Sequence, residues 1–299
     1  MLPPFIASQL PEGARSSMLD VGGGERMHIF EWGATAPTAP TVLFVHGNPT
    51  WSFLWRKVVA ALRETARGRE LRLVVPDLIG LGLSTKPAAA AHSLERHIGW
   101  LGSAIDGLAL GPLVLVGQDW GGPIGLGAMS ERLGRLRAIV FGNTVVGPPS
   151  ATFKPSWFHR FARAPVIATL AFRGMSFPLH HMHLSQGDRS SIRGDVARAY
   201  RWPLRKLADR AAPLALARMV PDSATDHPSI PALRRTEHAY RTAEVPVRLV
   251  WGMKDPILGR VVGHMQRLRP DAKVVKTGAG HFLQEEVPDE LAAAVLDVV

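Results

Sequence analysis

The chain has 299 residues and no cysteine, with 46% hydrophobic and 20% charged residues. This composition excludes a disordered chain, and the length predicts one large domain, or one domain with a sizeable insertion. The absence of cysteine excludes disulfides, thiolate catalysis and cysteine–zinc sites, and it favours a cytoplasmic location. We expect no signal peptide, and no stretch approaches the roughly 18 apolar residues of a membrane span, so we expect no membrane partner.

The chain is basic, with 35 lysines and arginines against 25 acidic residues and a formal charge of +10. Such a balance is compatible with nucleic-acid binding. However, arginine is spread along the chain, with only a modest concentration around residues 188–210, and we find no nucleic-acid-binding module. The charge therefore predicts a solvated basic surface and no nucleic-acid partner.

Strand-like segments alternate with helix-like segments along most of the chain. Residues 16–33 predict two strands joined by a glycine turn, at an antiparallel edge. Later apolar runs that end at Gly, Pro or Asp predict strands buried on both faces: 41–47, 71–77, 113–117, 137–142, 247–252 and 272–278. Segments with helical spacing lie between them: 51–66, 93–108, 121–133 and 287–298. The alternation predicts βαβ units and a parallel sheet.

The alternation breaks once, between about residues 146 and 228. Proline-punctuated helical segments there carry seven aromatic residues: Phe153, Trp157, Phe158, Phe161, Phe172, Phe177 and Trp202. A helical block between two strands of one sheet predicts a lid over the strand ends. We therefore expect a core domain of residues 1–146 and 229–299, and a cap domain of residues 147–228. Most of the aromatic side chains should pack the interior of the cap, and only a few should line a pocket.

The sequence "GQDWG" at residues 117–121 places Asp119 between a predicted strand and a predicted helix. Its glycines permit a tight turn that holds the Asp119 side chain clear of the sheet at a helix N-terminus, where the helix dipole favours an anion. The pattern is that of a Gly-x-nucleophile-x-Gly turn with a carboxylate in place of a hydroxyl. Taken alone, it fits a plain N-capping aspartate equally well.

Two further candidates follow predicted strands. Asp255 lies in "WGMKDPI" and His281 lies in "GAGHFLQEE". In an open α/β sheet, ligands bind beyond the carboxyl ends of the strands, so we expect Asp119, Asp255 and His281 at one edge. Their chain order, nucleophile then acid then histidine, is that of the triads of α/β-hydrolases.

Five motifs in the same order resemble those of the haloalkane dehalogenases of the α/β-hydrolase superfamily. They are "HGNPTWSFLW", "PDLIGLGLSTKP", "GQDWGGP", "WGMKDPI" and "GAGHFLQEEVPDELA". The resemblance runs from about residue 18 to the C-terminus and is weakest in the predicted lid. It implies an α/β-hydrolase fold, with a mostly parallel eight-stranded sheet flanked by helices and a helical cap inserted after the sixth strand.

The resemblance implies a chemistry that needs a carboxylate at position 119. A serine would form a stable ether with an alkyl halide, whereas Asp119 would displace the halide and form an ester that water can cleave. His281 would act as general base and Asp255 would orient it, with no metal and no cofactor. The implied substrates are small halogenated aliphatic compounds, and the products are an alcohol, a halide ion and a proton.

The departing halide needs hydrogen-bond donors in a dry pocket. The family uses a tryptophan at the position of Trp120, and one of its branches uses an asparagine at the position of Asn48. The backbone N–H groups of these two residues would also form the oxyanion hole.

One position assigns the chain to a branch of the family. Asn143 stands where some members carry the triad acid, so the resemblance favours Asp255 as the acid and the branch with an Asn–Trp halide pair. In that branch the cap supplies no second tryptophan for the halide, so neither Trp157 nor Trp202 is expected to bind it. Members of this branch often associate, so self-association stays open.

Three other groups of residues are not expected to take part in the chemistry. The histidines of "HHMH" at 180–183 lack a partnering carboxylate pattern and do not predict a metal site. Gly22–Gly24 form a turn and lack the spacing of a phosphate loop. Glu95, His97 and Asp106 lie on a helix that we expect to be exposed, with solvated side chains.

Three alternative functions need to be distinguished from this one. An epoxide hydrolase would share the Asp nucleophile, but that family places two tyrosines in the lid to protonate the alkoxide. This chain has only Tyr200 and Tyr240, and Tyr240 is expected after the lid. A fluoroacetate-type dehalogenase is disfavoured, because we would expect an arginine where Trp120 follows the nucleophile. A hydrolase fold that has lost catalysis and binds a small apolar ligand is the third alternative.

Overall fold

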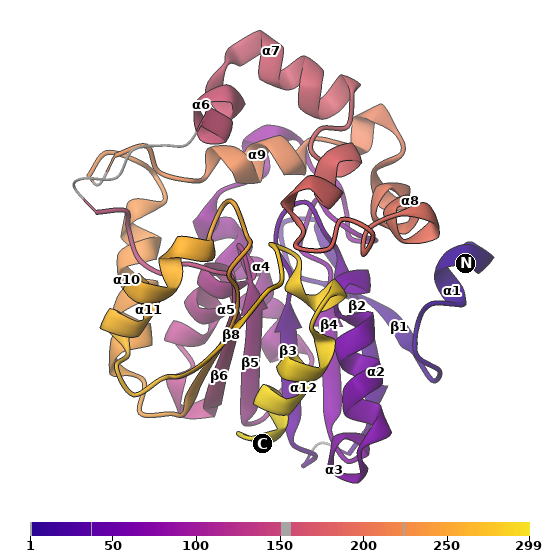
Figure 1. The fold of residues 1–299 in the computed structure, drawn as a ribbon, viewed down its shortest axis with the longest axis vertical. Helices are drawn as coiled ribbons and strands as arrows, with labels where there is room; N and C mark the ends of the chain where they lie inside the picture. Colours follow the sequence, from indigo (N-terminus) through magenta and orange to yellow (C-terminus); the bar gives the residue numbers. More distant parts are fainter. Residues whose placement is uncertain (1, 37, 151–156, 224) are drawn as a thin grey trace.

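The computed structural model describes residues 2–36, 38–150, 157–223 and 225–299. Eight strands form one sheet in the order β1-β2-β4-β3-β5-β6-β7-β8 (Figure 1). β1 and β2 pair antiparallel, β2 pairs antiparallel with β4, and the remaining neighbours are parallel. The strands are β1 (Arg15–Asp20), β2 (Arg26–Gly33), β3 (Thr41–Val45), β4 (Arg72–Pro76), β5 (Leu113–Gln118), β6 (Leu136–Gly142), β7 (Val247–Gly252) and β8 (Lys273–Thr277). The predicted parallel sheet with an antiparallel edge is confirmed.

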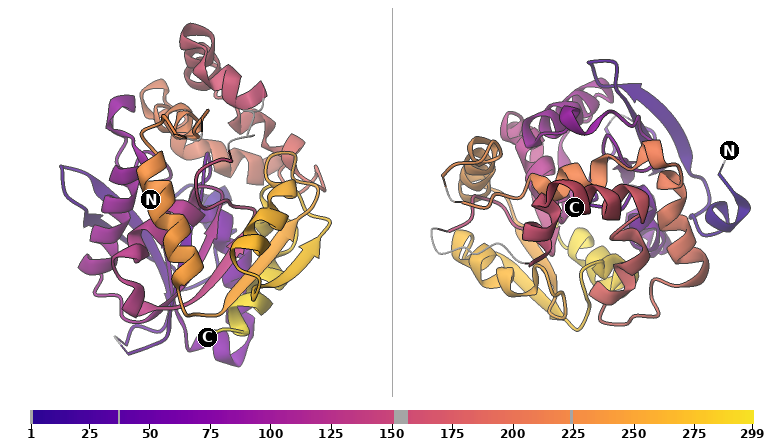
Figure 2. Two further views of the ribbon diagram at one scale, coloured as in Figure 1. Left: turned by 90° about the vertical axis from the view of Figure 1, so that its left-hand side faces the viewer. Right: turned by 90° about the horizontal axis from the view of Figure 1, so that it is seen from above.

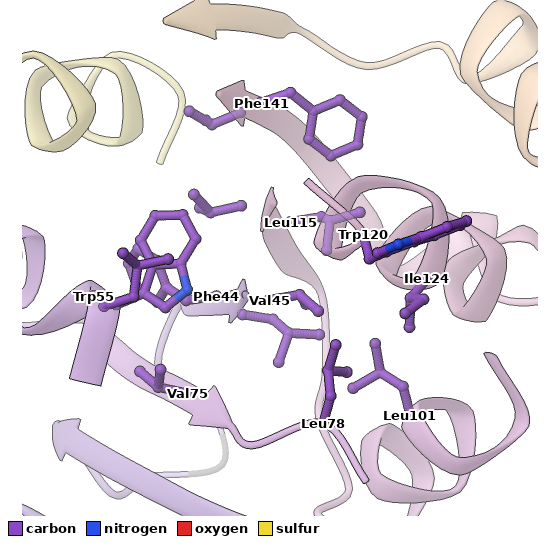
Figure 3. Packing of buried hydrophobic residues seen from close by; sticks show 14 of the residues in the cluster. Phe44, Val45, Trp55, Val75, Leu78, Leu101, Leu115, Trp120, Ile124 and Phe141 are labelled. Carbon is purple, nitrogen blue, oxygen red and sulfur yellow. The ribbon is translucent and has the colours of Figure 1, made fainter. Parts of the chain in front are cut away.

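Helices cover both faces of the sheet (Figure 2). On one face α2 (Arg56–Glu64) packs against α12 (Pro288–Leu296), and on the other α5 (Gly121–Ser130) packs against α4 (Leu94–Gly107) and α10 (Ile230–Thr242). Side chains that alternate along β3 serve both layers: Phe44 packs against Trp55, and Val45 lies toward Ile124 (Figure 3). This two-sided burial explains why the central strands are continuous apolar runs.

The edge strand β8 differs from the prediction. The sequence predicts burial on both faces, but most of its residues are exposed or only half-buried. It has a single neighbour, β7, so one of its edges and much of its surface meet solvent. Lysines at both ends of the "KVVK" sequence are compatible with such an edge.

The prediction for His97 was wrong, because this side chain is only 1% exposed. It lies on the same face of α4 as Leu94, Leu101 and Ala104, which are also buried, and helical spacing places all four together. Burial lowers the pKa of His97 to about 3, helped by the nearby histidines. Glu95 and Asp106 face solvent as expected, and both are ion-paired with arginines.

The segment between β6 and β7 is helical, and we call residues 157–218 of it the cap helices. They are α6 (Trp157–Arg163), α7 (Pro165–Thr169), η4 (Leu170–Gly174), η5 (Leu179–Ser185), α8 (Gly194–Arg201), η6 (Trp202–Leu204), η7 (Leu207–Asp209) and α9 (Ala212–Arg218). They lie above one end of the sheet, with α7 farthest from it (Figure 1).

The cap helices have a small apolar core of their own. The rings of Phe161, Phe172 and Phe177 pack against one another, with centroids 5.3–6.4 Å apart. The expectation that aromatic side chains fill the cap interior is confirmed for these three. Phe153 and the side chains of Trp157 and Phe158 lie outside the described residues.

A buried group of ionic and polar side chains connects α8 of the cap helices with α2. Arg56 of α2 donates to both carboxylate oxygens of Glu285 at 2.5 and 2.9 Å, and the Tyr200 hydroxyl of α8 donates to the same carboxylate at 2.5 Å. All three side chains are buried. Because a buried charge without its partner is costly, these groups depend on one another.

Replacing Glu285 with alanine should lower the free energy of unfolding by about 3–5 kcal/mol, because Arg56 would stay buried without its carboxylate. Urea denaturation measures the change. Asp195→Ala is a suitable control, since it breaks an exposed pair with Arg198 and should leave stability nearly unchanged. Equal losses in the two variants would contradict the assignment.

Candidate active site

Asp119 sits in a sharp turn between β5 and α5. Its φ is +52°, in the left-handed region that non-glycine residues rarely adopt. The turn is anchored on the neighbouring strand end: the Asp119 N–H donates to the Asn143 carbonyl, and the Thr144 hydroxyl donates to the Asp119 carbonyl. The predicted strand-to-helix turn is therefore present, and it lifts the carboxylate above the end of the sheet.

Backbone N–H groups hold the Asp119 carboxylate. The Asn48 N–H donates to Oδ1 at 2.8 Å, and the Trp120 N–H also bonds to the carboxylate. Gly47 makes this approach possible, because a Cβ there would lie 2.3 Å from Oδ1. Burial raises the pKa of Asp119, although His281 and the two N–H groups act against the rise.

His281 and Asp255 form a buried pair beside Asp119. The Nδ1 atom of His281 lies 2.8 Å from Oδ2 of Asp255. Burial alone would lower the pKa of His281, but the charge and hydrogen bond of Asp255, with the charge of Asp119, raise it overall. Burial alone would raise the pKa of Asp255, but the charge and hydrogen bond of His281 outweigh burial and lower this pKa overall. The pair favours an imidazolium facing a carboxylate.

The other ring nitrogen of His281 faces the first carboxylate. Nε2 lies 3.7 Å from Oδ2 of Asp119, too far for a direct hydrogen bond. The Gln118 amide nitrogen lies 3.4 Å from the same Nε2 atom, at the long end of hydrogen-bond distances, so a water molecule near the carboxyl carbon would compete only with this weak contact. The Asp119 side chain is 18% exposed, whereas that of His281 is only 2% exposed.

Asn143 and Gln118 support the pair, and the sequence did not assign them these roles. The Asn143 amide donates to Asp255 Oδ2 at 2.7 Å and to the Gly252 carbonyl at 2.9 Å. The buried Gln118 amide donates to the His281 carbonyl at 3.0 Å. The available signal was position, because both residues stand at the ends of strands that lead into the site.

Asn48 and Trp120 also lie next to Asp119. The Asn48 amide nitrogen donates to the Pro213 carbonyl of α9 at 2.9 Å, which leaves one of its two N–H groups uncommitted. Among the described residues, the indole N–H of Trp120 has no hydrogen-bond partner in the structure. The structure therefore brings all five predicted site residues together, and it gives Asn48 a bond to the cap that the sequence did not predict.

In the part of the chain that the structure describes, no three His, Cys, Asp or Glu side chains are arranged to hold a metal ion. None of the described helices has the length and hydropathy needed to span a bilayer.

Comparisons with known proteins identify the family of the chain. The family model of the alpha/beta hydrolase fold matches residues 40–288. "Haloalkane dehalogenase 2" of Mycobacterium tuberculosis H37Rv is 32% identical over 291 residues, which cover 91% of each chain. The chain belongs to the haloalkane dehalogenase family.

Two further relatives extend this comparison across the family. The "Haloalkane dehalogenase" of Mycolicibacterium paratuberculosis is 31% identical over 300 residues, covering 98% of this chain and 92% of that protein. Among solved structures, the haloalkane dehalogenase DatA from Agrobacterium tumefaciens C58 has a TM-score of 0.82 and 25% identity. The match covers 98% of this chain and 99% of that one. The match to this structure therefore extends over nearly the whole chain.

Proposed function

We propose that this member of the haloalkane dehalogenase family hydrolyses the carbon–halogen bond of small haloalkanes. Asp119 is the nucleophile, His281 the general base and Asp255 the triad acid, and the reaction uses no metal and no cofactor. One observation carries the proposal: a carboxylate occupies the strained nucleophile turn, with Oδ1 bonded to Asn48 and Oδ2 beside His281.

The first step is an in-line displacement. Oδ2 of Asp119 attacks the carbon that bears the halogen, a C–O bond forms, and the carbon–halogen electron pair leaves with the halide. The uncommitted N–H of Asn48 and the indole N–H of Trp120 stabilise the halide ion as it forms. No acid is required, because a halide ion leaves without a proton.

The second step is ester hydrolysis. A water molecule attacks the carboxyl carbon of Asp119 while His281 Nε2 removes its proton, and Asp255 stabilises the resulting imidazolium. The N–H groups of Asn48 and Trp120, which already bond the carboxylate, stabilise the oxyanion. When this intermediate collapses, the ester C–O bond breaks, the leaving oxygen takes the remaining proton of the attacking water and departs as the alcohol, and the Asp119 carboxylate is restored. His281 then returns its proton to solvent.

The charges of the site prepare His281 for this second step. In the free protein the negative charge of Asp119 contributes to the raised pKa of His281. Alkylation converts Asp119 into a neutral ester and removes that contribution. The pKa of His281 then falls, so the histidine is more readily available as a neutral base when a base is needed.

Tyrosine placement argues against an epoxide hydrolase. The Tyr200 hydroxyl is bonded to Glu285, and Tyr240 is buried in α10 with its ring stacked on Phe141. These are the only tyrosines of the chain, so no tyrosine pair is available to protonate an alkoxide. A silent binding protein would need neither the His281–Asp255 pair nor the bonds that support it.

The proposal also covers the domains, partners and compartment of the protein. We assign residues 1–146 and 229–299 to the core domain and residues 147–228 to the cap domain. The partners are the haloalkane, water and the released halide, with no nucleic acid and no membrane, and the compartment is the cytoplasm. Copies of the chain can also associate with one another, and sedimentation measures the mass of the assembly directly.

Replacing His281 with phenylalanine should trap the ester, because alkylation proceeds and hydrolysis lacks its base. After exposure to 1,2-dibromoethane, mass spectrometry should find an alkyl adduct on the peptide that carries Asp119. The double variant that also carries Asp119→Asn is the control and should give no adduct. An unmodified Asp119 peptide in a folded His281→Phe protein would rule out the covalent mechanism.

Replacing Trp120 with phenylalanine should slow the alkylation step by about 10²–10³-fold, because one halide donor is lost. The rate is measured as bromide release within a single turnover. Trp202→Phe is the matched control, since Trp202 lies in the cap with Arg205 over its ring and has no assigned role. Similar losses in both variants would contradict the donor role of Trp120.

The pH dependence should differ between the free protein and the ester. The hydrolysis rate should fall as the pH drops through the pKa of His281 in the ester, because the protonated ring cannot accept a proton. That apparent pKa should lie below the one obtained for His281 in the free protein by NMR titration. Single-turnover kinetics across pH provide the comparison, and an equal or higher kinetic pKa would refute the charge argument.

A further inference from the structure

A segment that leads away from the cap helix η5 lies directly against the loop that carries His281. The His281 N–H donates to the Ser185 carbonyl at 2.8 Å. The next residue, Phe282, is bonded twice by one side chain: its N–H donates to Gln186 Oε1 at 2.9 Å, and its carbonyl accepts from Gln186 Nε2 at 3.1 Å. Gln186 is only 6% exposed, so these bonds are shielded from water.

A second set of bonds continues this contact. The N–H groups of Gly187 and Asp188 donate to the Glu286 carboxylate at 3.1 and 2.8 Å, and the Gly280 N–H donates to the same carboxylate. The two backbones approach so closely that a Cβ on Gly187 would lie 2.4 Å from the Gly278 carbonyl oxygen. Residues 185–188 and 278–286 therefore form one connected unit.

The position of His281 thus depends on groups from both parts of the chain. Asp255 orients the ring and Gln118 bonds the carbonyl, and both belong to strand ends of the sheet. The N–H groups of His281 and Phe282 bond only to residues 185 and 186 among the described residues. A shift of the Phe282 backbone would move Nε2 relative to the carboxyl carbon of Asp119.

We propose that Gln186 is a positioning residue for His281, so that the segment following η5 helps to set the rate of ester hydrolysis. This inference rests on the proposed function. Gln186 does not touch the reacting atoms, and it acts by holding the backbone of Phe282. Misplacing a reacting group by about 1 Å can cost a factor of about 10² in rate.

The two chemical steps should depend on Gln186 to different degrees. Alkylation depends on Asp119, Trp120 and Asn48, which are held by β5, α5 and the loop after β3 and have no bond to Gln186. Hydrolysis depends in addition on His281. Loss of the Gln186 bonds should therefore slow hydrolysis and spare alkylation, whereas a purely structural role would affect both steps or only stability.

The experiment compares three variants with the wild-type protein in single turnovers of 1,2-dibromoethane. Gln186→Ala removes both bonds to Phe282. Gln186→Glu keeps an acceptor for the Phe282 N–H and loses the donor. Ser191→Ala is the matched control, because the Ser191 hydroxyl accepts from the same Gln186 amide at 3.2 Å and does not bond the His281 loop. Bromide release reports alkylation, alcohol formation reports hydrolysis, and thermal melts verify folding.

In Gln186→Ala, hydrolysis should slow by about 10–100-fold while alkylation stays within about twofold of wild type, so the alkylated protein accumulates. Gln186→Glu should recover part of the loss, and Ser191→Ala should match wild type in both steps. Parallel loss of both steps, or unchanged hydrolysis in folded Gln186→Ala, would overturn the inference alone. If Gln186→Ala does not fold, the same two criteria apply to Gln186→Glu, with a smaller loss expected. A wild-type protein that releases no bromide would overturn the proposed function and the inference with it.

Discussion

The left-handed backbone at Asp119 is the constraint on which the site depends. Such a conformation costs about 1–3 kcal/mol for a residue with a side chain, and it persists only where the surrounding structure compensates. Here the compensation comes from the Asn143 carbonyl just after β6, the hydroxyl of Thr144, and the close approach of Gly47. The strained turn places the carboxylate where two backbone N–H groups meet it, so one local geometry supplies both the proposed nucleophile and the proposed oxyanion donors.

The electrostatics of the site follow from burying two carboxylates around one histidine. Asp255 has several partners that favour its charge, namely His281, Asn143 and the Ile257 N–H, and its pKa is lowered. Asp119 also has three such partners, but His281 lies 3.7 Å away without a direct hydrogen bond and the charge of Asp255 acts against that of Asp119. Burial therefore dominates, and the pKa of Asp119 is raised. Two residues of the same type are therefore prepared for different tasks. The lowered pKa of Asp255 favours its charged form, whereas burial makes the charged form of Asp119 less favourable, which agrees with the proposed conversion of Asp119 into a neutral ester.

The residues between β6 and β7 take part in the site in more than one way. They bond the amide of Asn48 through Pro213, the backbone of the His281 loop through Ser185 and Gln186, and the Arg56–Glu285 pair through Tyr200. We therefore expect substitutions in this part of the chain to affect the site even where they do not touch the reacting atoms.

The sequence by itself determined the alternation of strands and helices along the chain, and it identified the five candidate side chains of the site. Apolar runs that end at Gly, Pro or Asp locate strand ends, and ligand sites of α/β sheets lie there, so local patterns made Asp119, Asp255 and His281 candidates. The roles of Asn48 and Trp120 came from the resemblance to the dehalogenase family. Only the tertiary structure decided the burial of His97, the exposure of β8, and the hydrogen bonds that Asn143, Gln118 and Gln186 make around the site. These depend on which neighbour each residue meets after folding. Gln186 and Phe282 are 96 positions apart in the chain, and no local pattern encodes a bond across that separation.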